Sequence, residues 1–168
     1  MFKKIKKTKK ITETQKLKEK ARKTLNGQFP KTSKTYVADT SAIIHKYLIK
    51  LIKKGLKGKI IIPNAVMAEL ENLANKGQEV GFIGLEEVAN LHKLKKKYKV
   101  TIFFQGIRPQ ESHIKFSRSG EIDSLIRQIA SKNKAILITA DLVQAKSAQA
   151  YGLKVIFLKK VTRNYKFD

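Results

Sequence analysis

The chain has 168 residues, 42% of them hydrophobic, so it is long enough for one buried core but too short for two domains of ordinary size. It carries 37 Lys and Arg against 13 Asp and Glu, a formal net charge of +24 that favours a polyanionic partner, first nucleic acid and second an anionic membrane surface. The absence of Cys excludes disulfides and thiolate zinc sites, and no apolar run approaches the roughly 20 residues of a membrane-spanning helix. We therefore expect a soluble, cytoplasmic protein.

The first 34 residues differ in composition from the rest. They hold 13 Lys and Arg against only two acidic residues, Glu13 and Glu19. Thr12 and Gln15 have capping-box spacing, and apolar residues then recur every four positions before Gly27, which is typical of a short helix. We expect residues 1–34 to form a basic helical extension that contacts RNA; the alternative is a solvated tail that only adds solubility.

From Thr35 to Asp168 we expect a second domain, in which short apolar runs alternate with helical patterns. The runs predict five strands: 36–38, 59–62, 99–104, 135–139 and 154–158. Apolar spacing predicts helices within 43–52, 66–73, 85–94, 122–129 and 142–152. Asn64 is the expected N-cap of the second helix, and Phe82, Phe103 and Phe104 are expected in the core. Strands that alternate with helices predict an α/β protein of three layers, α/β/α, around a parallel sheet of about five strands.

Four acidic residues follow strand-like runs or lie in the helices after them: Asp39, Glu69, Asp123 and Asp141. Because the carboxyl ends of parallel strands lie along one edge of a sheet, these side chains can meet there. Taken singly, Asp39 and Asp141 are equally well explained as helix N-caps, and Glu69 as a surface residue of its helix. Asp123 is harder to explain in this way, because it lies among apolar residues, where an unpaired charge is costly.

Four carboxylates gathered in one place predict a site for Mg²⁺ or Mn²⁺. Such groups repel one another, and hard divalent cations with a preference for oxygen ligands relieve that repulsion. A bound ion can lower the pKa of a water molecule and neutralise charge on a phosphodiester. The three His residues share no ligand spacing, so the pattern argues against zinc.

The order of these motifs resembles that of PIN-domain nucleases over residues 35–158. Asp39 precedes Thr40 and Ser41, Glu69 precedes Leu70, Asp123 lies at the start of a helix, and Asp141 follows a strand that ends in Thr139. The stretches around Asn64–Glu71, Gly81–Leu85 and Gly120–Asp123 are similar to those of the archaeal PIN domain that is usually fused to an ATPase and a KH domain. Neither of those two parts is present in this chain, so whether it is a free-standing protein or the front of a longer one stays open.

The resemblance implies a metal-dependent endoribonuclease in which Asp39, Glu69, Asp123 and Asp141 are catalytic and bind the metal. Ser41 and Thr139 are then accessory residues that hydrogen-bond a carboxylate or a metal-bound water, although helix capping and strand-end bonding explain them equally well. Glu121 is either a helix-dipole residue or a ligand through water. Basic residues near the acidic motifs are the candidates to hold RNA, although a solvated helix face explains each equally well: Lys46, Arg118, Arg127 and Lys146.

Two other classes of function compete with the nuclease. One is a PIN fold that binds RNA within a ribonucleoprotein complex without cutting it; the other is a phospho-receiver-like switch, which the placement of Glu69 and Asp123 on helices fits poorly. As a nuclease, the protein acts either as a toxin held by an antitoxin or as a factor in ribosomal or other RNA processing, which the basic extension favours slightly. Dimerisation is common in the family that the chain resembles.

Overall fold

The computed structural model describes residues 34–110, 112, 114 and 120–158. The predicted basic extension of residues 1–34, including its helix, lies outside this range except for Lys34, and so does the candidate RNA-binding residue Arg118. None of the helices in the described part of the chain is both long enough and apolar enough to cross a bilayer.

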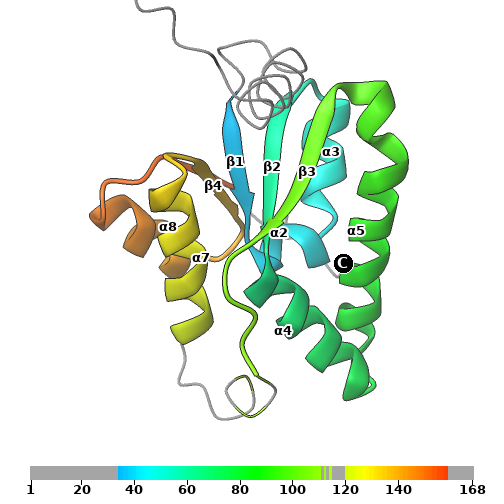
Figure 1. Cartoon of the computed structure of the whole chain (residues 1–168), viewed down its shortest axis with the longest axis vertical. Helices are drawn as coiled ribbons and strands as arrows, with labels where there is room; N and C mark the ends of the chain where they lie inside the picture. The colour runs from blue at the N-terminus through cyan, green and yellow to red at the C-terminus, as the bar shows by residue number, and fades with distance from the viewer. Residues whose placement is uncertain (1–33, 111, 113, 115–119, 159–168) are drawn as a thin grey trace, which may run out of the picture. The chain divides into compact units, whose positions relative to one another are not determined.

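Five parallel strands form one sheet in the order β3-β2-β1-β4-β5 (Figure 1). The strands are β1 (Thr35–Ala38), β2 (Gly58–Pro63), β3 (Val100–Gln105), β4 (Ile136–Thr139) and β5 (Val155–Phe157). Each of the five predicted strands is therefore present. The central strands are buried along almost their whole length, as expected for a parallel sheet with helices on its faces.

Helices connect the strands and cover both faces of the sheet, so the predicted α/β/α fold is confirmed. They are α2 (Thr40–Ile44), α3 (Tyr47–Lys53), α4 (Asn64–Asn75), α5 (Glu79–Tyr98), α7 (Glu121–Lys132) and α8 (Leu142–Ala150). On one side α5 packs against α2, α3 and α4, while α7 packs over β1, β2 and β4 on the other (Figure 1). Right-handed crossovers account for this division, because the chain moves outward from β1 to β3 and then returns to β4.

The single helix predicted within residues 43–52 is wrong, because the chain forms two helices there. Lys46, between α2 and α3, has a left-handed backbone with φ of 55°. The buried carboxylate of Glu87, on α5, accepts a hydrogen bond from the Ile49 backbone N–H at 3.1 Å. This bond satisfies one of the free N–H groups in the first turn of α3, so a helix begins there although its own N-cap residue supplies no side-chain acceptor.

The predicted N-cap role of Asn64 is also wrong. Pro63 holds the position before α4, and Asn64 is the first helical residue. The Asn64 side-chain amide instead donates to the Gly106 carbonyl oxygen at 2.7 Å, just beyond β3. Asn64 therefore joins the start of α4 to the carboxyl end of the neighbouring strand.

The helical hairpin of α4 and α5 depends on a close approach at Gly81. A Cβ atom at this position would lie 2.3 Å from the Ala74 backbone nitrogen and 2.8 Å from the Leu70 carbonyl oxygen. Any side chain would therefore force the helices apart. The contact fixes α4 beside α5 within one residue of Glu69.

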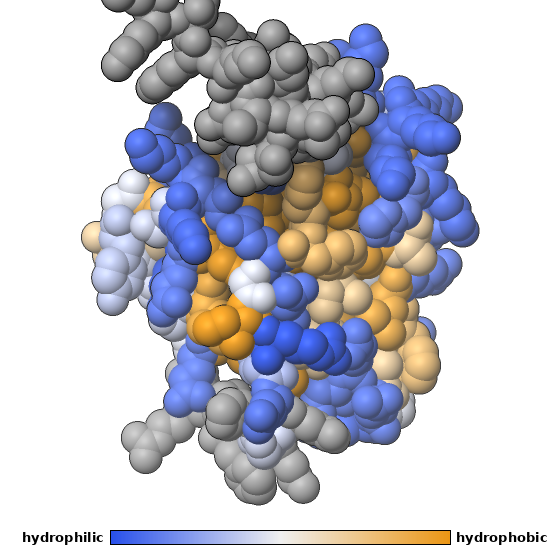
Figure 2. Space-filling view, viewed as in Figure 1, coloured by the Kyte–Doolittle hydropathy of each residue, from blue (hydrophilic) through white to orange (hydrophobic). Residues whose placement is uncertain are grey.

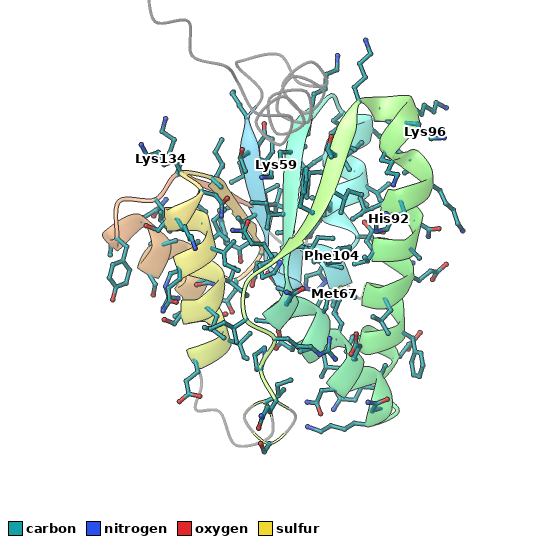
Figure 3. All side chains as sticks on the ribbon, in the orientation of Figure 1. Lys59, Met67, His92, Lys96, Phe104 and Lys134 are labelled. Carbon is teal, nitrogen blue, oxygen red and sulfur yellow. The ribbon has the colours of Figure 1, made fainter. Side chains whose placement is uncertain are left out.

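The prediction that Phe82 and Phe104 belong to the core is wrong, since their side chains are 57% and 45% exposed. Phe104 stacks on His92 of α5 with ring centroids 5.8 Å apart (Figure 3). Figure 2 shows apolar surface over β3, and hydrophilic surface over the end of α5 where Figure 3 labels Lys96. An edge strand has no further strand beside it, so aromatic residues near its end are only partly covered.

Candidate metal centre

The site lies where the direction of the chain across the sheet reverses. Strands β1 and β4 are neighbours, and the crossovers from them lead to opposite edges of the sheet. In open α/β sheets, ligands bind at the carboxyl ends of the strands at this switch point. Asp39 and Asp141 are the first or second residues after these two strands, so the fold places both acids there.

Asp39 is held at the junction of the two strands. Its side chain is only 3% exposed, and its Oδ2 atom accepts hydrogen bonds from Ser41 Oγ at 2.5 Å and Thr139 Oγ1 at 2.7 Å. Ser41 Oγ in turn accepts from the Ala140 backbone N–H at 2.8 Å. Although Asp39 occupies the N-cap position of α2, its side chain makes no capping bond. The hydroxyls of Ser41 and Thr139 thus orient one carboxylate, and their role in catalysis stays a prediction.

Glu69 approaches from α4 and is half-buried, so it is not a free surface residue. Thr40 Oγ1 donates to its Oε2 atom at 2.5 Å. Burial raises the pKa of Glu69, the hydrogen bond from Thr40 opposes this rise, and the charges of Asp39 and Asp123 add to it. The neighbouring Glu71 pairs instead with Arg108.

Asp123 lies in the first turn of α7 and is also half-buried. Burial raises its pKa, the charges of Asp39 and Asp141 raise it further, and the guanidinium of Arg127 one turn along the helix lowers it. The four acids therefore act on one another electrostatically, and we call Asp39, Glu69, Asp123 and Asp141 the carboxylate cluster.

Asp141 caps α8, as one of its two sequence-based interpretations predicted. Its Oδ1 atom accepts a hydrogen bond from the Gln144 backbone N–H at 2.9 Å. The Asp141 backbone N–H donates to Thr139 Oγ1 at 3.0 Å, which fixes the turn between β4 and α8. Capping occupies one carboxylate oxygen and leaves the other available, so it does not exclude a second role.

Gln144 is a residue that the sequence analysis missed. Its side chain is fully buried, accepts from Arg127 Nη1 at 2.5 Å and donates to the Asp123 carbonyl oxygen at 3.2 Å. Gln144 thus joins α8 to the first turns of α7 beside the cluster. The spacing Asp141-x-x-Gln144 is that of a capping box and marks this Gln in the sequence, but it does not reveal that the side chain reaches another helix.

Each acid of the cluster offers an oxygen to a cation. Within the described residues, Asp39 Oδ1, Glu69 Oε1, Asp141 Oδ2 and both side-chain oxygens of Asp123 receive no hydrogen bond. In the described part of the chain, every fully buried side-chain oxygen or nitrogen has a hydrogen-bond partner. The oxygens of Asp39, Glu69 and Asp123 that receive no hydrogen bond are therefore in contact with solvent. Carboxylate oxygens that contact water and repel one another are suitable ligands for a hard cation.

Among the described residues, no three acids or histidines are close enough together to form a ready-made metal cage. Mg²⁺ dehydrates reluctantly, keeps several of its waters and is usually held by one or two carboxylates together with substrate phosphates. The acids of the cluster supply oxygen ligands of the kind that hard divalent cations take.

The other predicted site residues lie at different distances from the cluster. Arg127 is the basic residue that acts on Asp123, whereas the charge of Lys46 acts on Glu87, on the α5 side of the fold. Lys146 on α8 and Glu121 at the start of α7 are exposed. The RNA-binding role predicted for the basic residues and the accessory role predicted for Glu121 stay predictions.

The raised pKa values of Glu69 and Asp123 determine the direction in which these two groups make folding stability depend on pH. Between the ordinary and the raised pKa, the folded state holds protons that the unfolded state has lost. The contribution of these groups to stability therefore falls as pH rises through that window, and stays low above it. We expect the midpoint of urea unfolding in EDTA to rise as the pH is lowered from neutral towards the ordinary carboxyl range.

Glu87 needs a separate control in this experiment, because burial raises its pKa as well. Glu87→Gln removes that contribution and should keep most of the pH dependence, whereas Glu69→Gln should reduce it and leave the part that Asp123 contributes. An unchanged slope in Glu69→Gln would show that Glu69 does not carry the effect.

The parallel sheet and the acids at its switch point place this chain among α/β proteins whose carboxylates can bind divalent cations. Residues 36–159 match the model of the PIN domain family. An uncharacterised KH- and PIN-domain-containing protein of Methanocaldococcus jannaschii is 38% identical over 75% of this chain and 20% of its own length. The Holliday junction branch migration ATPase PINA of Sulfolobus acidocaldarius is 23% identical over 72% of this chain and 22% of its length.

A solved domain of a Methanocaldococcus jannaschii protein of unknown function superimposes with a TM-score of 0.74 and 34% identity. The match covers 81% of this chain and 99% of that domain. This chain belongs to the PIN domain family, as the order of its acidic motifs predicted. Members of this family are generally nucleases and typically use divalent metal ions. The chain spans about a fifth of the length of the curated relatives named above.

Proposed function

We propose that the chain is a metal-dependent endoribonuclease that hydrolyses RNA phosphodiester bonds at the carboxylate cluster. The observation that supports this proposal is electrostatic: at the switch point the charges of Asp39 and Asp123 raise the pKa of Glu69, and those of Asp39 and Asp141 raise the pKa of Asp123. A bound cation relieves the repulsion within such a cluster, and a chain with a net charge of +24 attracts the polyanion that such an ion can help to cleave.

The residues of the chain have distinct roles in this proposal. Mg²⁺ or Mn²⁺ bound at the cluster supplies a water of lowered pKa and neutralises charge on the phosphodiester. Asp39, Glu69, Asp123 and Asp141 would hold the ion, and Thr40 would fix one oxygen of the Glu69 carboxylate by its hydrogen bond. Arg127, fixed by Gln144, presents a guanidinium beside Asp123 that can pair with a phosphate oxygen of the bound strand.

RNA is proposed as the substrate because the chain belongs to the PIN family and is strongly basic. A single-stranded or looped segment suits the site, because its phosphates can reach a cluster at the edge of a sheet. The basic composition of residues 1–34 adds affinity for large RNA whatever its sequence, which favours a role in RNA processing over that of a toxin.

The test is cleavage of labelled single-stranded RNA, hairpin RNA and single-stranded DNA of the same sequence, each with Mn²⁺, with Mg²⁺ and with EDTA. We expect internal cuts in RNA that require metal, and RNA affinity that falls steeply with added salt. Tight RNA binding without cutting under any metal condition would replace the proposal with an RNA-binding module. Cutting of DNA alone would leave the metal site in place and overturn the substrate class.

A further inference from the structure

A pocket lies between α7 and the end of α8. Its volume is about 290 Å³, at the small end of the range for ligand pockets. The residues that line it are Ser124, Arg127, Gln128, Ser131, Tyr151 and Leu153. None of them is acidic, and Ser124 directly follows Asp123 of the cluster.

Tyr151 gives this pocket an aromatic wall. It follows the last residue of α8, and its side chain is 77% exposed, so the ring adds little to the core. The guanidinium carbon of Arg127 lies 5.8 Å from the centre of the Tyr151 ring, within range of a cation–π contact. Exposed aromatic rings next to arginine are the platforms on which bases of single-stranded nucleic acids stack.

Arg127 joins this pocket to the cluster. Its Nη1 atom donates to the side-chain oxygen of the buried Gln144, and the Gln144 amide donates in turn to the Asp123 carbonyl oxygen. The guanidinium is therefore held in one place rather than free in solvent. A strand whose phosphate lies at the cluster thus passes a fixed cation, a stacking surface and the polar side chains of Ser124, Gln128 and Ser131.

We propose that this pocket seats one nucleobase of the RNA strand that crosses the carboxylate cluster, stacked on Tyr151. The proposal rests on the proposed function for its choice of RNA. Leu153 and the Tyr151 ring cover the faces of the base, while the hydroxyls and the Gln128 amide meet its polar edge. The pocket sets the register of the strand, and so the position of the cut relative to the seated base.

The experiment uses short single-stranded RNAs with the fluorescent base 2-aminopurine at successive positions, bound to the full chain in EDTA so that no strand is cut. We expect strong quenching at one position, and for Tyr151→Ala a loss of that quenching with roughly 5- to 150-fold weaker binding. Tyr151→Phe should keep both. Phe82→Ala, which removes another exposed aromatic ring, should behave as wild type.

Equal quenching and affinity in wild type and Tyr151→Ala would overturn the pocket assignment. Free 2-aminopurine ribonucleotide serves as the competing probe. If Tyr151 quenches the fluorescence of the free nucleotide but not that of the labelled strand, the pocket binds a free nucleotide and the strand proposal fails. Because stacking is measured without metal, a chain that never cuts RNA can still show it. If the chain cuts RNA and Tyr151→Ala quenches 2-aminopurine as strongly as wild type does, the pocket assignment is rejected while the proposed function is retained.

Discussion

Asp39→Asn is expected to lose metal-dependent RNA cleavage by at least about a hundredfold, since even residues that merely support metal ligands cost 10- to 100-fold when removed. The amide keeps the size of the side chain and one oxygen that can accept from Ser41 and Thr139. What it removes is the negative charge at the junction of β1 and β4. Single-turnover cleavage of labelled RNA with Mn²⁺ measures this loss.

RNA binding and folding should survive the same change. Asp39 is buried, and its charge raises the pKa of both Glu69 and Asp123, so the metal-free protein gains from losing that charge. We expect Asp39→Asn to unfold in EDTA at the same or a higher urea concentration than wild type. Glu86→Gln, which neutralises an exposed acid on α5, is the matched control. Wild-type cleavage by Asp39→Asn would remove this residue from the site.

Gln144→Met is expected to lower the free energy of unfolding by about 1–3 kcal/mol, because it leaves polar partners without a hydrogen bond. Methionine has a similar length and fills the buried space, but it cannot accept from Arg127 or donate to the Asp123 carbonyl oxygen. Urea unfolding measures the loss. Gln149→Met, on the exposed side of the same helix, should be nearly neutral.

The same variant should need a higher metal concentration for half-maximal cleavage, because Asp123 and Arg127 are no longer fixed against α8. A purely structural role would lower stability while leaving the metal dependence of the folded protein unchanged. Activity as a function of Mn²⁺ concentration, at a temperature where both proteins are folded, separates the two outcomes. Identical metal dependence would limit Gln144 to packing.

The strands and the position of the cluster could be predicted from the sequence because both follow from local patterns. Apolar runs bounded by turn residues mark the strands, and Asp39 and Asp141 directly follow two of them. A parallel sheet then places those residues at one edge whatever the details of packing. This is why the acids could be grouped although about 100 residues separate Asp39 from Asp141.

The features that the sequence did not predict depend on contacts between distant elements. The break at Lys46 coincides with a hydrogen bond from α3 to Glu87 on α5, which the apolar spacing of residues 43–52 does not contain. Asn64 is a favoured N-cap by type, but Pro63 holds that position, and the Asn64 side chain bonds Gly106 instead. The role of Gln144 likewise follows from the packing of α8 on α7. Each of these three features involves a contact with a residue far away in the sequence.

The central claim is that the carboxylate cluster binds a divalent metal ion. Titration of Mn²⁺ into the metal-free full chain, followed by the loss of the free-ion electron paramagnetic resonance signal, tests it without any assumption about substrate. Wild type and Glu86→Gln should show the same saturable binding, and Asp39→Asn should bind more weakly by about tenfold or more. Absence of saturable binding in wild type, or equal binding in all three proteins, would contradict the account.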